Sequence, residues 1–158
     1  MAVEVVGAKE LVAKLCQISE DLTGPPMIDA MRKSTLLVTR TARQRAPIDR
    51  GGLRASIMPE VVIETKKVIG IVGSNKIHAP AQELGTKPYW APLQPLINWV
   101  RRKGMATGNA IYAVAKGVQR AIARRGIIPK EFLKKGLEEN TERIINILDQ
   151  AVTRIIKK

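Results

Sequence analysis

The chain has 158 residues, of which 45% are hydrophobic but only 3% aromatic, and its formal net charge is +13. This length fits one domain with an aliphatic core, and the scarcity of aromatic rings argues against binding single-stranded nucleic acid by base stacking. The charge indicates an acidic partner such as nucleic acid, an anionic membrane or an acidic protein surface.

The lone cysteine and the hydropathy pattern exclude further classes of protein. Cys16 is the only cysteine, which excludes an intrachain disulfide and a Cys-x-x-Cys metal site. No signal-peptide pattern is visible, and no apolar run approaches the ~18 residues expected of a membrane span. We therefore expect a single domain over residues 1–158 that is made in a reducing cytoplasm and does not bind a membrane.

The first third of the chain predicts helices. Residues 1–6 form a short apolar start that fits an edge strand. Ala8 to Leu22 predicts a helix with leucines at three- and four-residue spacing, and Cys16 beside that stripe is expected to be a buried thiol. Thr23 is expected to cap the main helix, which runs from Met27 to Arg45. One face of this helix carries Met27, Met31, Val38 and Ala42.

A hairpin is predicted next. The Pro, Asp and Gly residues from Pro47 to Gly52 supply turn chemistry. Leu53–Thr65 and Lys67–Gly73 then predict two antiparallel strands, because Leu53, Ala55 and Ile57 alternate with other residues. Pro59 inside the first strand indicates an edge or a bulge, and an edge strand can pair with a neighbouring subunit.

The segment from Asn75 to Gln94 is rich in proline and glycine and is expected to be irregular. It contains His78 and Glu83, but a metal site is not favoured because the chain has only one histidine. We expect Glu83 to cap backbone amides or to pair with a cation on a neighbouring chain.

Two basic helices and a long terminal helix complete the predicted elements. Leu93–Lys103 and Asn109–Arg125 predict helices that end in cations, as the helix dipole favours. Pro129 is expected to start the last helix, whose seven-residue repeat packs against the chain's own sheet or against another subunit. That repeat consists of Leu137, Thr141, Ile144, Leu148, Ala151 and Ile155.

Together these elements predict an α+β fold. A small antiparallel β-sheet is expected to pack against the long helix and the C-terminal helix, with residues 75–126 as a loop-plus-helix insertion. The sequence has no phosphate-binding loop, no dinucleotide fingerprint and no nucleophile elbow. Carboxylates are few and scattered, so we expect neither an enzyme nor a cofactor or metal.

The stretch from Ala42 to Thr86 carries a family pattern. It contains Ala46-Pro47-Ile48-Asp49, Gly51-Gly52-Leu53, Ser56-Ile57, Val72-Gly73-Ser74, Ala79, Glu83 and Gly85-Thr86. This series resembles the tail-completion, or head–tail joining, family of tailed bacteriophages, in which Ala-Pro-x-Asp-Thr-Gly-x-Leu-x-x-Ser-Ile ends a basic helix. A strand ending near Val-Gly-Ser and a Tyr-Ala-x-x-x-Glu-x-Gly-Thr segment then follow. Arg50 replaces the usual Thr, and His78 replaces the usual Tyr.

The resemblance implies a structural virion protein of the phage neck, located at the head–tail junction. Such a protein would form a ring, sixfold to match a tail, between head-completion (adaptor) proteins and the tail terminator, around the DNA channel. Contacts with copies of itself or with these neighbours are then expected at Pro47, Asp49, Leu53, Ser56, Glu83, Gly85, Thr86, Trp90, Ile144, Leu148 and Ile155.

The alternative is a double-stranded nucleic-acid-binding protein that acts through its basic helices. Its affinity would fall steeply with salt. In either case the cations could be a solvated surface, or they could face genomic DNA or an acidic partner. The candidates are Arg40, Arg43, Arg101, Arg102, Lys103, Arg120, Arg124 and Arg125.

Overall fold

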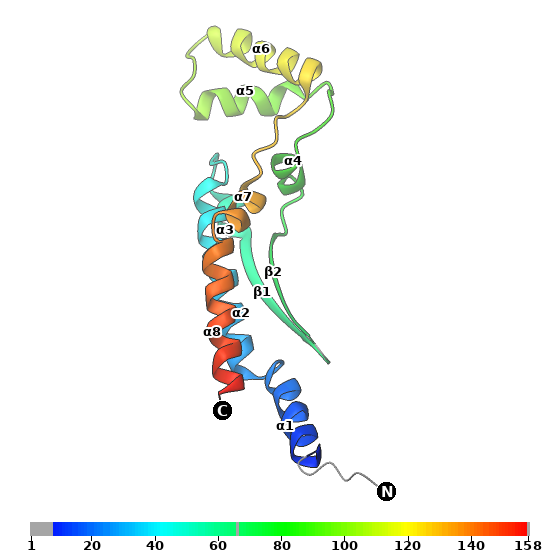
Figure 1. Cartoon of the computed structure of the whole chain (residues 1–158). Coiled ribbons are helices and arrows are strands. Elements are labelled where there is room, and N and C mark those ends of the chain that lie inside the picture. The colour runs from blue at the N-terminus through cyan, green and yellow to red at the C-terminus, as the bar shows by residue number, and fades with distance from the viewer. Residues whose placement is uncertain (1–7, 66, 158) are drawn as a thin grey trace, which may run out of the picture.

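The computed structural model describes residues 8–65 and 67–157 and shows an elongated α+β fold, which confirms the predicted fold class (Figure 1). The apolar start at residues 1–6, for which an edge strand was predicted, lies outside the described residues. The elements are α1 (Ala8–Asp21), α2 (Pro25–Arg45), α3 (Gly52–Ser56), β1 (Ile57–Glu64), β2 (Lys67–Ser74), α4 (Ala79–Glu83), α5 (Leu93–Arg102), α6 (Ala110–Arg125), α7 (Phe132–Glu138) and α8 (Thr141–Ile156).

Helix α2 is the centre of the body, and small side chains let its neighbours approach closely. Gly70 of β2 lies over Met31 and Thr35, where a Cβ atom would come within 2.7 Å of the methionine sulfur. Gly136 of α7 lies against Ala42 and the Val38 carbonyl. The buried hydroxyls on this helix donate to carbonyls of the preceding turn, as Thr39 does to Thr35 at 2.7 Å. The hairpin and the C-terminal helices α7 and α8 therefore all pack against α2.

The β1–β2 hairpin is antiparallel, with Ile57 opposite Ser74 and Glu64 opposite Lys67. One face, which includes Ile57 and Gly70, packs on α2. The other face carries Met58 and Ile71, which are 64% and 45% exposed. Among residues 8–65 and 67–157 this sheet has two strands, so each strand has one edge that no other described strand pairs.

The hydrophobic core lies where α2, α3, β1, α4 and α7 meet. Phe132 of α7 is fully buried there, as is Ile57. The residues around them are small or aliphatic, so the core depends on close approach of the backbones. The cluster consists of Ala42, Ala46, Leu53, Ile57, Ala79 and Phe132.

Helices α5 and α6 pair with each other and stand beyond the body, at the opposite end of the molecule from α1 (Figure 1). Two connecting segments, residues 84–92 and 126–131, join this helical pair to the body. A buried hydrogen bond from Gln119 of α6 to the Ala91 carbonyl, 2.7 Å long, fixes α6 against the incoming connector. Gly126 ends α6 with φ of +73°, which confirms the predicted glycine stop.

Several local predictions were wrong. Residues 52–56 form the helical turn α3 rather than the start of a strand, and α4 interrupts the segment predicted to be irregular. Thr23 donates to the Glu20 carbonyl and so ends α1, whereas Gly24 is the N-cap of α2. Cys16 is exposed, because α1 projects from the body and makes few contacts with it.

The last helix is split in two and does not begin at Pro129. Glu131 has φ of +50° and precedes α7, so the helix starts after it. The side chain of Asn140 donates to the Gly136 carbonyl and to Thr41 of α2, which holds the break between α7 and α8. Helix α8 then packs chiefly against α2 instead of the sheet, with Ala151 and Ile155 buried.

Candidate interaction surfaces

Asp49, a predicted interface residue in the loop after α2, makes contacts within the chain. Arg102 of α5 forms a two-pronged ion pair with Asp49, at 2.6 and 3.2 Å, and Lys103 donates to the Ile48 carbonyl at 2.6 Å. The hydrogen bond from Arg102 lowers the pKa of Asp49, so its carboxylate remains charged to a lower pH than an isolated aspartate. Asp49, Arg102 and Lys103 thus attach the tip of α5 to the body.

Glu83 caps helix α7. Its two carboxylate oxygens accept hydrogen bonds from the backbone amides of Leu133 and Lys134, each at 2.9 Å. These amides belong to the first turn of α7, where free N–H groups and the helix dipole favour an anion. Of the two roles predicted for Glu83, the capping of backbone amides is therefore confirmed.

Gly85 and Thr86 lie where the two connectors meet. The Thr86 amide donates to the Ile127 carbonyl, and the Ile127 amide donates back to the Thr86 hydroxyl, both at 3.0 Å. Gly85 has φ of +75°, and a Cβ atom there would lie 2.5 Å from the same Ile127 carbonyl oxygen. These two residues hold the connectors together.

Other predicted interface residues divide between core and surface. Leu53 and Ile155 are buried inside the chain, so their side chains do not reach the surface of this subunit. Ser56 and Ser74 share a hydrogen bond of 2.7 Å that joins the end of α3 to the end of β2. Trp90 is 68% exposed, whereas Pro47, Ile144 and Leu148 are half-buried.

The predicted cations also divide into two groups. Arg43 donates twice to the Ile57 carbonyl, at 2.7 and 3.0 Å, and together with Arg102 and Lys103 it is engaged within the chain. The remaining cations are exposed and have no carboxylate partner among residues 8–65 and 67–157. They are Arg40, Arg101, Arg120, Arg124 and Arg125.

The sequence analysis missed a set of exposed apolar side chains. The most exposed are Ile77, at 99%, and Leu84, at 78%. For the hairpin, the sequence did contain a sign that both faces are covered. Residues 61–63 and 68–69 are apolar without alternation, which is typical of strands covered on both faces. Further exposed apolar side chains are Val12, Leu15 and Leu22 on α1, Met58, Ile63 and Ile71 on the hairpin, and Ile145 and Ile156 on α8.

Neither a metal site nor a membrane-spanning helix is found in the described part of the chain. Residues 8–65 and 67–157 contain no cluster of three His, Cys, Asp or Glu that could hold a metal ion. His78 is exposed. None of the described helices combines the length and hydrophobicity that crossing a membrane would require.

Comparison with known proteins adds no family assignment. No protein-family model matches the chain, and neither a curated protein nor a solved structure matches it.

Replacing Glu83 with Ala should lower the free energy of unfolding by about 2 kcal/mol, because two charge-assisted hydrogen bonds at the start of α7 are lost. Urea denaturation followed by circular dichroism measures this change. Glu83→Gln retains one acceptor oxygen, so its free energy of unfolding should lie between those of the parent and of Glu83→Ala. Glu60→Ala, which removes an exposed carboxylate, should stay within about 0.5 kcal/mol of the parent. Equal stability of Glu83→Ala and Glu60→Ala would contradict the capping role.

Proposed function

We propose that the protein is a structural component of a phage neck, that it assembles into a ring around the DNA channel, and that its task requires no bond chemistry. The family resemblance of residues 42–86 gives the biological setting. The observation that carries the proposal is the amount of apolar side chain left exposed on separate surfaces of one chain, namely α1, the outer hairpin face and α8. Exposed apolar patches of this kind mark protein–protein contact sites.

The distribution of these surfaces supports a ring more than a simple pair. A twofold dimer uses one self-complementary patch, whereas a ring requires two different patches on each subunit that fit one another. Helix α1 and the outer hairpin face are two such patches, and Figure 1 shows α1 as a projecting arm. Head-completion and tail-terminator proteins would cover the remaining apolar surface, with many modest contacts adding up through avidity.

Labelling of virus particles tests this function. Gold-labelled antibody against the chain is applied to intact and to tail-less particles of the phage that encodes it, and the particles are viewed by electron microscopy. The proposal expects label at the head–tail junction, and thus a virion location. Particles without label, with the protein found on cellular DNA, would refute the neck assignment.

Charge on the outer hairpin face should prevent self-association. In the double variant Met58→Lys/Ile71→Lys, two exposed apolar side chains become cations. Each apolar side chain contributes on the order of 1.5 kcal/mol when buried, so self-association should weaken about a hundredfold. Light scattering should then show the 17.4 kDa monomer in place of a species six times heavier.

The matched control adds the same charge at exposed polar positions. Gln44→Lys/Gln94→Lys should assemble like the parent, because it alters no apolar side chain. The free energy of unfolding of both double variants should lie within about 0.5 kcal/mol of the parent's, since the changed side chains are exposed. If the hairpin variant still assembles normally, the outer hairpin face is not the ring contact.

A further inference from the structure

One continuous segment of the chain contains no carboxylate. Residues 84–130, which include α5, α6 and both connectors, have no Asp and no Glu but nine Lys and Arg. The rest of the chain is nearly balanced by comparison, with 18 basic and 14 acidic residues. The nine cations are Lys87, Arg101, Arg102, Lys103, Lys116, Arg120, Arg124, Arg125 and Lys130.

Three of these cations form a row on α6. Lys116, Arg120 and Arg124 follow each other at four-residue spacing, so they lie along one side of the helix over about 12 Å. Ala115 and Gln119, which face inward, are buried on another side of the helix. Arg120 and Arg124 are exposed, and Lys116 is half-buried. We call Lys116, Arg120 and Arg124 the α6 row.

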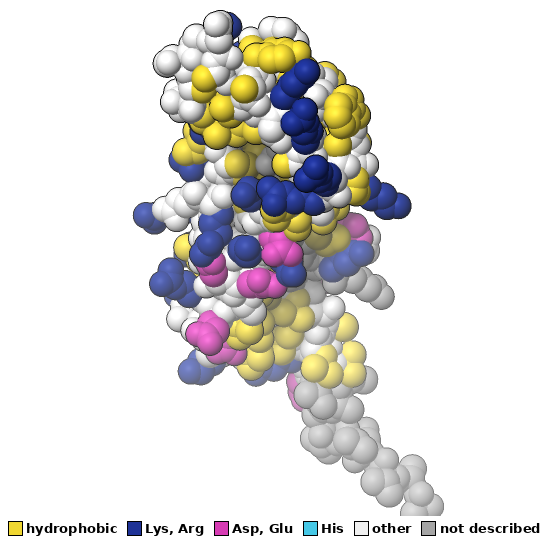
Figure 2. Space-filling model, turned by 90° about the horizontal axis from the view of Figure 1, so that it is seen from above, with side chains coloured by type: hydrophobic (Ala, Val, Ile, Leu, Met, Phe, Trp, Pro, Cys, Tyr) yellow, Lys and Arg dark blue, Asp and Glu magenta, His cyan; other side chains and the backbone are white. Residues whose placement is uncertain are grey.

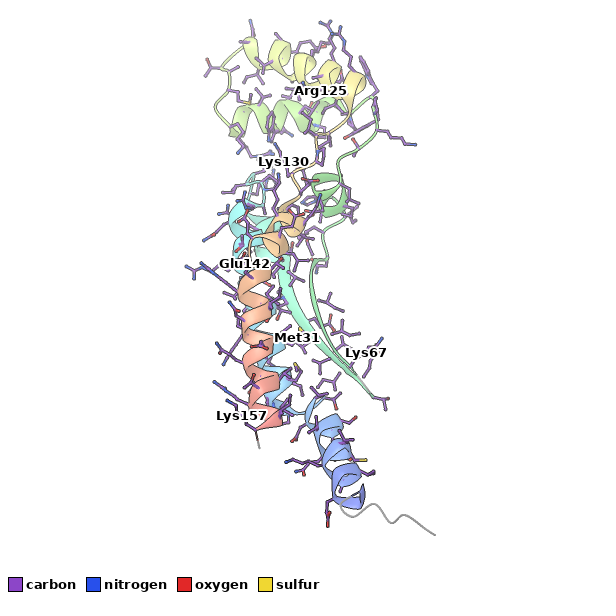
Figure 3. The ribbon with its side chains drawn as sticks, viewed as in Figure 1. Met31, Lys67, Arg125, Lys130, Glu142 and Lys157 are labelled. Atoms are coloured by element: carbon purple, nitrogen blue, oxygen red, sulfur yellow. The ribbon has the colours of Figure 1, made fainter. Side chains whose placement is uncertain are left out.

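The row carries unneutralised charge. None of its members has a carboxylate partner in the described part of the chain. Lys116 lies 4.9 Å from the ring centre of Tyr112, a cation–π contact that steadies the side chain but leaves its charge in place. Figure 2 shows this end of the molecule from above, with Lys and Arg side chains running across it and acidic side chains only farther down the view. Figure 3 shows Arg125 at the end of α6 and Lys130 on the connector below it.

The fold fixes the position of the row. Gln119 holds α6 to the Ala91 carbonyl, and the Asp49–Arg102 pair holds α5 to the body. A rigid helix with evenly spaced cations fits a rigid and regular anion. Duplex DNA is such an anion, because it carries one negative charge per about 1.7 Å of its axis, or roughly seven charges over the length of the row.

We propose that the α6 row is a binding site for the phosphate backbone of double-stranded DNA. Phosphate contacts position a protein on a duplex without reading its sequence, so the site is independent of base sequence. Single-stranded DNA is disfavoured, because it is bound by stacking on aromatic faces, and the row itself contains no aromatic side chain. The inference depends on the charges of one subunit and not on ring formation.

Fluorescence anisotropy with a labelled 20-base-pair duplex, from 50 to 200 mM NaCl, tests the site. The variant Lys116→Gln/Arg120→Gln/Arg124→Gln should bind the duplex about 30-fold more weakly at 50 mM NaCl. Its slope of log affinity against log salt should be shallower by about three, because three phosphate contacts are lost. The affinity of the parent should be the same for two duplexes of unrelated sequence.

The control removes the same charge elsewhere. Lys33→Gln/Arg143→Gln/Arg154→Gln changes three exposed cations of α2 and α8 that have no carboxylate partner among residues 8–65 and 67–157. It should bind the duplex within about threefold of the parent and keep the parent's salt slope. Circular dichroism confirms that both variants are folded. An equal loss in both variants would show that only net charge matters, and would overturn the site.

Three other probes identify the anion. Single-stranded DNA of the same length, poly-glutamate and vesicles containing phosphatidylserine represent a single strand, an acidic protein and an anionic membrane. Weaker binding to all three than to the duplex supports the proposal, and preference for any of them, or no duplex binding at 50 mM NaCl, overturns it. Light scattering on the same samples reports ring formation separately, so a monomer that binds duplex through the row would support this site and count only against the ring.

Discussion

Replacing Phe132 with Ala should lower the free energy of unfolding by about 3–5 kcal/mol, the range for removal of a buried aromatic side chain. Phe132 is fully buried and is the chain's only phenylalanine. Its neighbours, such as Ala42 and Ala46, are small and belong to elements that already approach closely, so they cannot move in to fill the cavity. Urea denaturation monitored by tryptophan fluorescence and circular dichroism measures the loss.

Phe132→Leu is the matched control, since it keeps most of the apolar volume. Its cost should be about 1 kcal/mol. If the alanine variant lost no more stability than the leucine variant, the cluster around Phe132 would not be the core of this fold.

Gly126→Ala should lower the free energy of unfolding by about 3 kcal/mol. The backbone at Gly126, with φ of +73° and ψ of −164°, lies in a region that is essentially restricted to glycine. A Cβ atom would also overlap the Thr86 carbonyl oxygen and lie 2.9 Å from the Lys87 carbonyl carbon. Both contacts are with backbone, so no side chain can turn aside to relieve them.

Gly108→Ala separates the two contributions. Gly108 also has a positive φ, +57°, but an added Cβ atom would meet nothing within 4 Å. Gly108→Ala should therefore lower the free energy of unfolding by only about 1 kcal/mol, the ordinary penalty for a left-handed residue. Denaturation curves for the two variants give the difference directly, and equal costs would mean that the crowding at Gly126 relaxes easily.

The long helices were predictable from the sequence because their signals are local. Helix α2 ends where Pro47 forbids helical dihedrals at the preceding residue, and α6 ends at Gly126. The split between α7 and α8 was not predictable, since it depends on Asn140 bonding to Thr41, 99 residues away in the chain. Helix α3 was misassigned because Leu53 and Ile57, both buried, also fit an alternating strand.

The candidate sites show the same division between local and distant causes. Composition alone identified the basic helices, but it could not show that Arg43, Arg102 and Lys103 are engaged within the chain. Nor could it show that Arg120 and Arg124 have no carboxylate partner among residues 8–65 and 67–157. That distinction depends on Ile57, Asp49 and Ile48, which tertiary folding brings close. Glu83, in contrast, was identified from the sequence, because it belongs to the family pattern. The structure then gives its physical role, which is to cap the start of α7.

The two hydrogen bonds that join Thr86 and Ile127 have a consequence for how such a gene can change. The chain leaves the body and returns to it at neighbouring points, 3.0 Å apart from donor to acceptor. A turn of only a few residues suffices to bridge such ends. Recombination at these two codon positions could therefore exchange, enlarge or delete the α5–α6 pair while the reading frame for the body's core is preserved. The α5–α6 pair, which carries the proposed DNA site, can thus diverge faster than the part that contains the core.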